Sequence, residues 1–158
     1  MILKKIISGG QTGADIAGLR AAKLGHLETG GTAPKGYRTL NGPNLELRDI
    51  YGLVEHFSAS YPPRTGVNVK DSDGTIRFAS NFNSPGERCT FNAIERHGKI
   101  SIDVNVNNPQ SPETIAKWVE DNSIATLNVA GNSEQTSPGI EAFVMDFMLK
   151  VIRILRGD

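Results

Sequence analysis

The sequence predicts an α/β protein with a Rossmann-like fold, a three-layer sandwich whose mostly parallel sheet carries helices on both faces. Three observations predict this fold. Short apolar runs alternate with amphipathic helical patterns, glycine-rich turns follow the apolar runs, and a chain of 158 residues has the length of one domain. We therefore expect residues 1–158 to form a single Rossmann-like ligand-binding domain.

The first two elements give the clearest start to this pattern. Residues 2–8 form a short apolar run that stops at two glycines, which is typical of a buried parallel strand. The next stretch has helical spacing, and four residues make its apolar face: Ala14, Ala17, Ala21 and Leu24. A strand, a glycine turn and a helix together open a Rossmann-like unit.

The middle of the chain is harder to interpret. Residues 30–64 are rich in Gly, Pro, Asn and Tyr, and we expect an irregular binding loop there with a short helix near 49–57. Regular structure is predicted to return as a strand at 75–79, a helix at 89–97 and a strand at 99–104.

The last third predicts a helix, a strand and a long helix. Ser111 is placed to cap a helix, and Pro112 suits its first position. Residues 124–129 read as a buried strand. A final amphipathic helix is expected to open at Ser137 and Pro138, with one apolar stripe: Ile140, Phe143, Val144, Phe147, Met148, Val151, Ile152 and Leu155.

Charge and composition narrow the function. Lysine and arginine total 17, as do aspartate and glutamate, so the formal net charge is zero and we expect no nucleic-acid partner. The single cysteine, Cys89, excludes an internal disulfide, and the three histidines are too widely spaced to predict a metal site. No apolar run approaches the roughly 18 residues that cross a bilayer, and no signal peptide is evident. We expect a cytoplasmic protein without a membrane partner.

Ligands of parallel sheets bind beyond the carboxyl ends of the strands. That rule points to four turns, at residues 9–15, 80–90, 104–109 and 129–137. Glycines in such turns let the backbone approach a ligand, and free amides at a helix start attract an anion. These turns favour a phosphorylated small molecule, a nucleotide or a pterin, as the partner.

The first turn is the strongest candidate. Its predicted ligand-binding residues are Gly9, Gly10, Gln11, Thr12, Gly13 and Asp15. We expect the backbone amides around Gln11 and Thr12 to be free to hold an anion. The turn matches neither G-x-G-x-x-G nor a phosphate-binding loop, and a tight turn capped by Thr12 is the alternative. Asp15 suits either a hydrogen bond from a ligand or stabilisation by the helix dipole alone.

Two later turns and the irregular segment add candidates. They are Ser84, Gly86, Arg88 and Thr90 in one turn, Gly131, Asn132 and Ser133 in the other, and Lys35 and Arg64 in the irregular segment. The cationic side chains can neutralise phosphates if they reach the ligand. Each position also fits an ordinary polar loop or solvated surface. We assign no catalytic residue, because Cys89 lacks an obvious histidine partner in sequence.

Several blocks of sequence match a known family in the same order. They are residues 7–15 (ISGGQTGAD), 33–36 (APKG), 41–43 (NGP), 64–65 (RT), 68–75 (NVKDSDGT), 127–131 (LNVAG) and 137–140 (SPGI). Over nearly its whole length the chain thus resembles the molybdenum-cofactor carrier family. That family belongs to a Rossmann-like superfamily that includes the lonely-guy phosphoribohydrolases.

The resemblance implies a homo-oligomeric carrier, a dimer or tetramer, for a phosphorylated pterin held at the glycine-rich turns. It adds Asp73, in the block at 68–75, to the ligand-binding candidates. No cofactor is required; the molybdenum cofactor or a nucleotide is expected as the bound ligand.

Departures from the family pattern keep two alternatives open. Ile16 stands where the family has arginine, and residues 131–133 (GNS) replace its Gly-Pro-Arg, so two cations are lost. This favours a receptor or sponge for a nucleotide-derived signalling molecule. The other alternative is an N-glycosidase like the lonely-guy enzymes, although their Pro-Gly-Gly-x-Gly-Thr turn is truncated here and Glu87 precedes Thr90 instead of following it.

Overall fold

The structure is a computed structural model that describes all 158 residues. Five strands form one sheet in which every neighbouring pair is parallel. In order across the sheet they are β2 (Glu28–Gly30), β1 (Lys5–Ile7), β9 (Thr126–Gly131), β7 (Gly74–Ala79) and β8 (Ile100–Asn105). The predicted α/β fold is confirmed, and its main sheet is parallel throughout.

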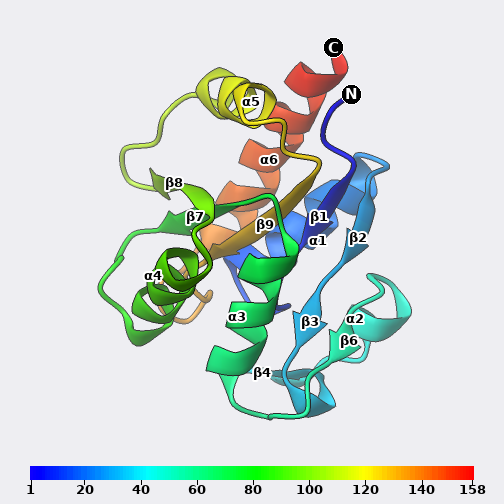
Figure 1. The fold of residues 1–158 in the computed structure, drawn as a ribbon, viewed down its shortest axis with the longest axis vertical. Coiled ribbons are helices and arrows are strands. Elements are labelled where there is room, and N and C mark those ends of the chain that lie inside the picture. Colours follow the sequence, from blue (N-terminus) through cyan, green and yellow to red (C-terminus); the bar gives the residue numbers. More distant parts are fainter.

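Helices cover both faces of this sheet (Figure 1). On one face, α6 (Ile140–Arg156) packs against both α1 (Ala14–Leu24) and α5 (Pro112–Asp121). On the other, α3 (Tyr61–Asp71) packs against α4 (Pro85–His97). The main core lies between the sheet and the first group of helices. There the rings of Phe78 and Phe147 pack edge to face, with their centroids 5.5 Å apart.

Serine caps and prolines position two of the helices. Ser111 accepts a hydrogen bond from the amide of Thr114, and Pro112 follows it in the first turn, as predicted. Ser84 caps α4 in the same way through the amide of Glu87. The sequence predicts a turn at 84–86 and a helix from 89, whereas the helix begins at Pro85.

The segment predicted to be irregular, residues 30–64, largely forms a small lobe that shares a core with α1. It contains β3 (Thr32–Ala33) paired with β6 (Val54–Glu55), the antiparallel pair β4 (Arg38–Thr39) and β5 (Gly42–Pro43), the 3-10 helix η1 (Lys35–Tyr37) and α2 (Glu46–Asp49). The predicted helix at 49–57 is wrong. Gly52 adopts a φ of 73° there, and the chain continues into β6.

Two further elements escape prediction from the sequence. β2 has only three residues and little apolar character. α3 contains two prolines and a glycine, but the prolines lie in its first turn, where a helix tolerates them. Its buried residues are Thr65, Gly66, Asn68 and Val69, so it shows no aliphatic stripe.

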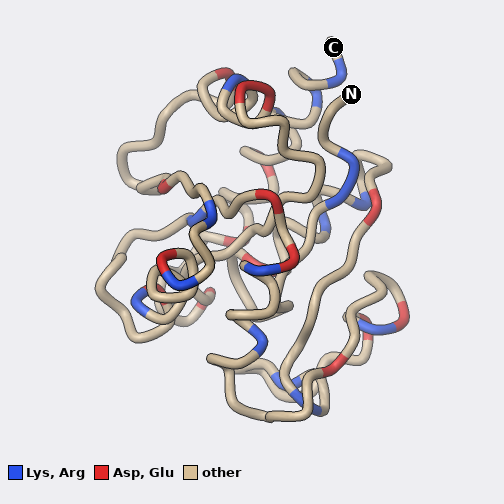
Figure 2. The backbone as a smooth tube through the Cα atoms, viewed as in Figure 1, with Lys and Arg blue, Asp and Glu red and all other residues tan.

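Acidic and basic residues are interspersed along the backbone, and no large part of it carries one sign alone (Figure 2). None of the helices combines the length and the apolar character that crossing a bilayer requires.

Candidate ligand-binding site

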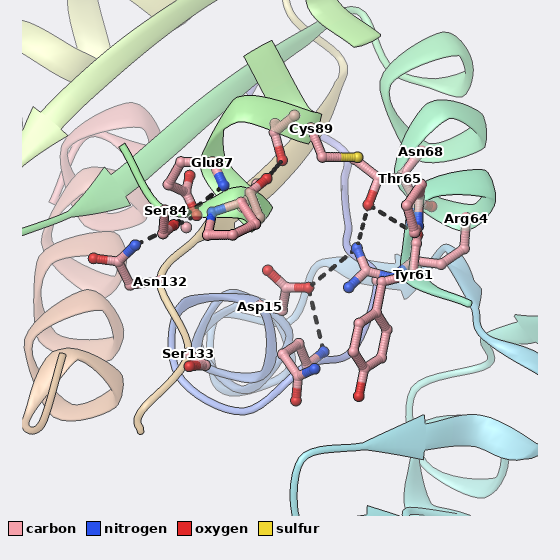
Figure 3. Close-up of a pocket in the computed structure, with 18 of the residues that line it drawn as sticks. Asp15, Tyr61, Arg64, Thr65, Asn68, Ser84, Glu87, Cys89, Asn132 and Ser133 are labelled. Carbon is pink, nitrogen blue, oxygen red and sulfur yellow. Dashed lines mark hydrogen bonds and ion pairs between the residues drawn. The ribbon is translucent and has the colours of Figure 1, made fainter. Parts of the chain in front are cut away.

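A pocket of about 460 Å³ opens at the carboxyl end of the sheet, with α3 and α4 on two of its sides (Figure 3). The end of β9 lines it at residues 128–131. The turns that follow β1, β7 and β9 all contribute, whereas the fourth predicted turn, residues 104–109, does not. A volume of this size is in the range of small-molecule sites.

Most of the predicted ligand-binding residues meet at this pocket. Those that line it are Gly9, Gln11, Asp15, Arg64, Ser84, Gly86, Thr90, Gly131, Asn132 and Ser133. Gly10, Thr12 and Gly13 line a different hollow. Lys35 and Arg88 are exposed and line neither.

Asp73 lies at the amino-terminal end of the strands, whereas the pocket lies at their carboxyl end. It immediately precedes β7, and its carboxylate accepts hydrogen bonds from the amides of Ala125 and Thr126 at 3.0 and 2.9 Å, where β9 begins. Because these strands are parallel, their starts are remote from the pocket at their carboxyl ends. Asp73 therefore joins two strand starts, and its prediction as a ligand-binding residue is wrong.

The glycine turn uses its own amides to hold its shape. The Gln11 amide donates to Asp15 Oδ2 at 3.2 Å, and the Thr12 amide donates to Gln11 Oε1 at 2.9 Å. The amide of Ala14, at the start of α1, donates to the carbonyl of Asn132 at 3.1 Å. The expectation that the amides around Gln11 and Thr12 are free for an anion is therefore wrong. An anion in this pocket needs other donors.

Two positions in this turn require glycine because neighbouring atoms lie too close to the backbone for a Cβ. A Cβ on Gly9 would lie 2.5 Å from Arg64 Nη1, so this glycine makes room for the arginine. Gly13 has a φ of 84°, and a Cβ there would lie 2.4 Å from the backbone oxygen of Asn132. Gly13 thus lets α1 begin directly against the end of β9.

Arg64 is the cation in the pocket. From α3 its Nη1 donates to Thr65 Oγ1 at 2.7 Å and lies 4.0 Å from Asp15 Oδ2 (Figure 3). Its side chain is 12% exposed, and its buried Nε has no partner. A guanidinium keeps its charge and carries five N–H donors, so several donors remain for a ligand.

Two buried carboxyl groups share the pocket with Arg64. Burial raises the pKa of Asp15 to about 6, although Arg64 and the amides of Gln11 and Gly9 lower it. Burial also raises the pKa of Glu87 to about 7, and the charge of Asp15 raises it further. Glu87 is therefore partly protonated at pH 7, whereas Asp15 is mostly ionised there.

Asn132 connects the turns after β7 and β9. Its Oδ1 accepts hydrogen bonds from the amides of Ser80 and Asn81 at 3.0 and 3.2 Å, and its Nδ2 donates to the carbonyl of Asn81 at 3.0 Å. The same Nδ2 lies 3.5 Å from Glu87 Oε2. Asn132 thus fixes the loop that leads into α4 and restrains Glu87.

Sequence reasoning missed several residues of the pocket. Glu87 was noted only as out of place relative to the family pattern, and Tyr61, Thr65 and Asn128 were not candidates. Glu87 had a usable signal, because it lies in the first turn of a serine-capped, proline-started helix after a strand. The α3 residues had none once the helix itself was missed.

The arrangement can bind an anion next to groups that exchange hydrogen bonds with a polar ring. Arg64 supplies positive charge, and the two carboxyl groups act as acceptors when ionised and as donors when protonated. No group of three or more His, Cys, Asp or Glu side chains lies close enough together to hold a metal ion.

The fold and the pocket define a class: a Rossmann-like α/β protein with a small-molecule site at the carboxyl end of its parallel sheet. The chain belongs to the Circularly permutated YpsA SLOG family, whose model matches residues 6–152. A crystal structure from Syntrophus aciditrophicus, named "Putative molybdenum carrier protein", is similar with 34% identity and a TM-score of 0.85. The similarity covers 96% of this chain and 95% of that one. The resemblance to molybdenum-cofactor carriers is thereby confirmed, while no curated protein matches the chain.

Proposed function

We propose that this protein binds a phosphorylated small molecule, a pterin phosphate or a nucleotide, and releases it unchanged. The observation that carries the proposal is Arg64, a largely buried cation with an unpartnered Nε, beside a pocket large enough for such a ligand. Phosphate oxygens are acceptors that match the geometry of a guanidinium. The similar Syntrophus structure is named as a molybdenum carrier, and a molybdenum-cofactor pterin as the cargo is consistent with that name.

The start of α4 supplies a second donor for the phosphate. Gly86 lines the pocket in the first turn of α4, and its amide has no partner within the protein. Amides at a helix N-terminus carry partial positive charge and bind anions. Gly86 and Arg64 together replace the glycine-turn amides as the proposed phosphate donors.

A thermal-shift panel tests the function. The panel contains neopterin monophosphate, GMP, AMP, NAD and inorganic phosphate. A ligand at 100 times its dissociation constant stabilises a protein by about 2.7 kcal/mol. For a chain of this length, that raises Tm by roughly 5 to 10 °C. The absence of a shift with every phosphorylated heterocycle would contradict the proposal.

One observation favours a second candidate, an N-glycosidase acting on nucleotides. Glu87 lines the pocket with a pKa raised by burial to about 7, which suits a general acid near neutral pH. Incubation with nucleoside monophosphates, followed by chromatography for the free base, tests this candidate. Base release that Glu87→Gln abolishes would support hydrolysis, and the absence of release would remove it.

A further inference from the structure

The pocket contains two buried hydrogen-bond acceptors that have no donor. They are Glu87 Oε1 and Asn128 Oδ1. Each residue is 2% exposed, and both line the pocket. A buried acceptor without a partner is costly, and native proteins contain few of them. Two in one pocket indicate a ligand that brings two donors.

Neighbouring side chains hold these acceptors in fixed orientations. Asn128 Nδ2 donates to Thr75 Oγ1 at 3.2 Å, which leaves the amide oxygen as the unpartnered atom. Glu87 Oε2 faces Asn132 Nδ2 at 3.5 Å, which leaves Oε1 unpartnered. Acceptors that are already oriented lose little freedom when a ligand binds, so they favour a matching pattern of donors.

We propose that Glu87 Oε1 and Asn128 Oδ1 recognise the N–H edge of a 2-amino-4-oxopyrimidine ring, the edge that guanine and pterins share. This inference rests on the proposed function and leaves the phosphate at Arg64. The ring N–H and the adjacent exocyclic amine supply two donors on one edge, one for each acceptor. Adenine has a ring acceptor beside its amine, so it supplies a donor to only one of the two acceptors.

The protonation state of Glu87 predicts a second measurable effect, the release of protons when the ring binds. Burial and the Asp15 charge raise the pKa of Glu87 to about 7, and Asp103 raises it slightly, while Arg77 and Asn132 lower it. In the empty pocket a proton therefore occupies part of the Glu87 population near pH 7. A ring N–H that donates to the carboxylate replaces this proton. Binding of the ring thus releases protons at pH 7 and fewer at pH 8.5.

Calorimetric titration tests the inference on the whole chain. GMP, neopterin monophosphate and AMP are titrated at pH 8.5 into wild type and into Glu87→Leu, which keeps side-chain bulk but removes the acceptor. Glu87→Gln, which keeps an acceptor without the charge, guards against a folding defect in the leucine variant. We expect GMP and neopterin monophosphate to bind wild type about 10 to 100 times more tightly than AMP. Glu87→Leu should abolish that preference, and Glu87→Gln should reduce it.

The outcomes separate the inference from the function on which it rests. Equal binding of AMP and GMP by wild type, or a preference that survives in Glu87→Leu, would overturn the inference and leave phosphate binding intact. Tighter binding of both neopterin monophosphate and GMP than of AMP would support it, and the tighter binder of the two would identify the source of the ring. Failure of all three ligands to bind would overturn the proposed function as well.

Discussion

Arg64 on α3 and Asp15 on α1 face each other beside the ligand pocket, with Nη1 of the arginine 4.0 Å from Oδ2 of the aspartate (Figure 3). This separation is longer than a hydrogen bond. Burial raises the pKa of Asp15 to about 6 despite the nearby cation, and at 4.0 Å the carboxylate makes no direct hydrogen bond to the guanidinium. The charge of Arg64 therefore remains available to an anionic ligand.

The first prediction concerns Arg64 itself. Arg64→Gln should weaken binding of GMP or neopterin monophosphate at least tenfold, because a charge-assisted hydrogen bond contributes about 1.5 to 3 kcal/mol. Calorimetric titration measures the loss. Lys35→Gln is the matched control, since Lys35 is exposed and does not line the pocket. An equal loss in both variants would mean that the ligand responds only to general surface charge.

Two glycine variants should separate binding from folding. Gly9→Ala places a methyl 2.5 Å from Arg64 Nη1, the movable end of a side chain, so affinity should fall while the melting temperature changes little. Gly13→Ala meets the backbone of Asn132 at 2.4 Å with a φ of 84°, and should destabilise the fold by roughly 2 kcal/mol or more. Urea unfolding combined with ligand titration distinguishes the two effects. Similar unfolding free energies for both variants would contradict the packing described around Gly13.

Glu87 should make the stability of the empty protein depend on pH. Its pKa rises from 4.5 to about 7 on folding, so the folded state binds this proton more tightly than the unfolded state does. The resulting contribution to the free energy of unfolding is complete below about pH 4.5 and is lost as the pH rises through 7. Glu87→Gln should therefore be more stable than wild type at pH 8, by on the order of 2 to 3 kcal/mol, with a smaller difference at pH 5. Urea unfolding at both values measures it.

Glu134 offers a control of opposite sign. The amides of Gly139 and Glu141 lower the pKa of this exposed carboxylate at the start of α6. Its contribution is present above its ordinary pKa and is lost as the pH falls, so Glu134→Gln should be slightly destabilised at pH 8 and less so at acidic pH. If both variants show the same pH trend, the burial assigned to Glu87 is incorrect.

Asn132 should matter for stability as well as for the pocket. Asn132→Ala removes three hydrogen bonds that tie the turn after β9 to residues 80–81, and should lower the free energy of unfolding by roughly 2 to 3 kcal/mol. Ser133→Ala removes two exposed hydrogen bonds within its own turn, one to the hydroxyl and one from the amide of Thr136, and should cost less, about 1 kcal/mol or below. Equal effects in urea unfolding would show that the Asn132 amide does not hold this loop.

Most of the sheet and its covering helices could be predicted from the sequence because those elements have strong local signals. Apolar runs bounded by glycine marked β1 and β9, and Ser111 with Pro112 marked the start of α5. α3 could not be predicted because its prolines and buried polar residues resemble a loop. Its helical form depends on packing against α4, which no local pattern reveals.

The position of the site could be predicted more readily than its chemistry. Strand direction alone brings the turns after β1, β7 and β9 together. Whether an amide is free depends on side-chain geometry, and Asp15 and Gln11 occupy the amides that appeared available. Asp73 lies in a block that matches the family, but it immediately precedes a strand of the parallel sheet. It therefore lies at the amino-terminal end of the strands, away from the pocket.

Native mass spectrometry tests most directly whether Arg64 holds a phosphorylated ring in this pocket. Wild type, Arg64→Gln and Lys35→Gln are each incubated with a mixture of pterin phosphates and nucleoside monophosphates and then sprayed intact. We predict one added ligand mass on wild type and on Lys35→Gln, and little or none on Arg64→Gln. The same adduct in equal amount on Arg64→Gln would contradict the account.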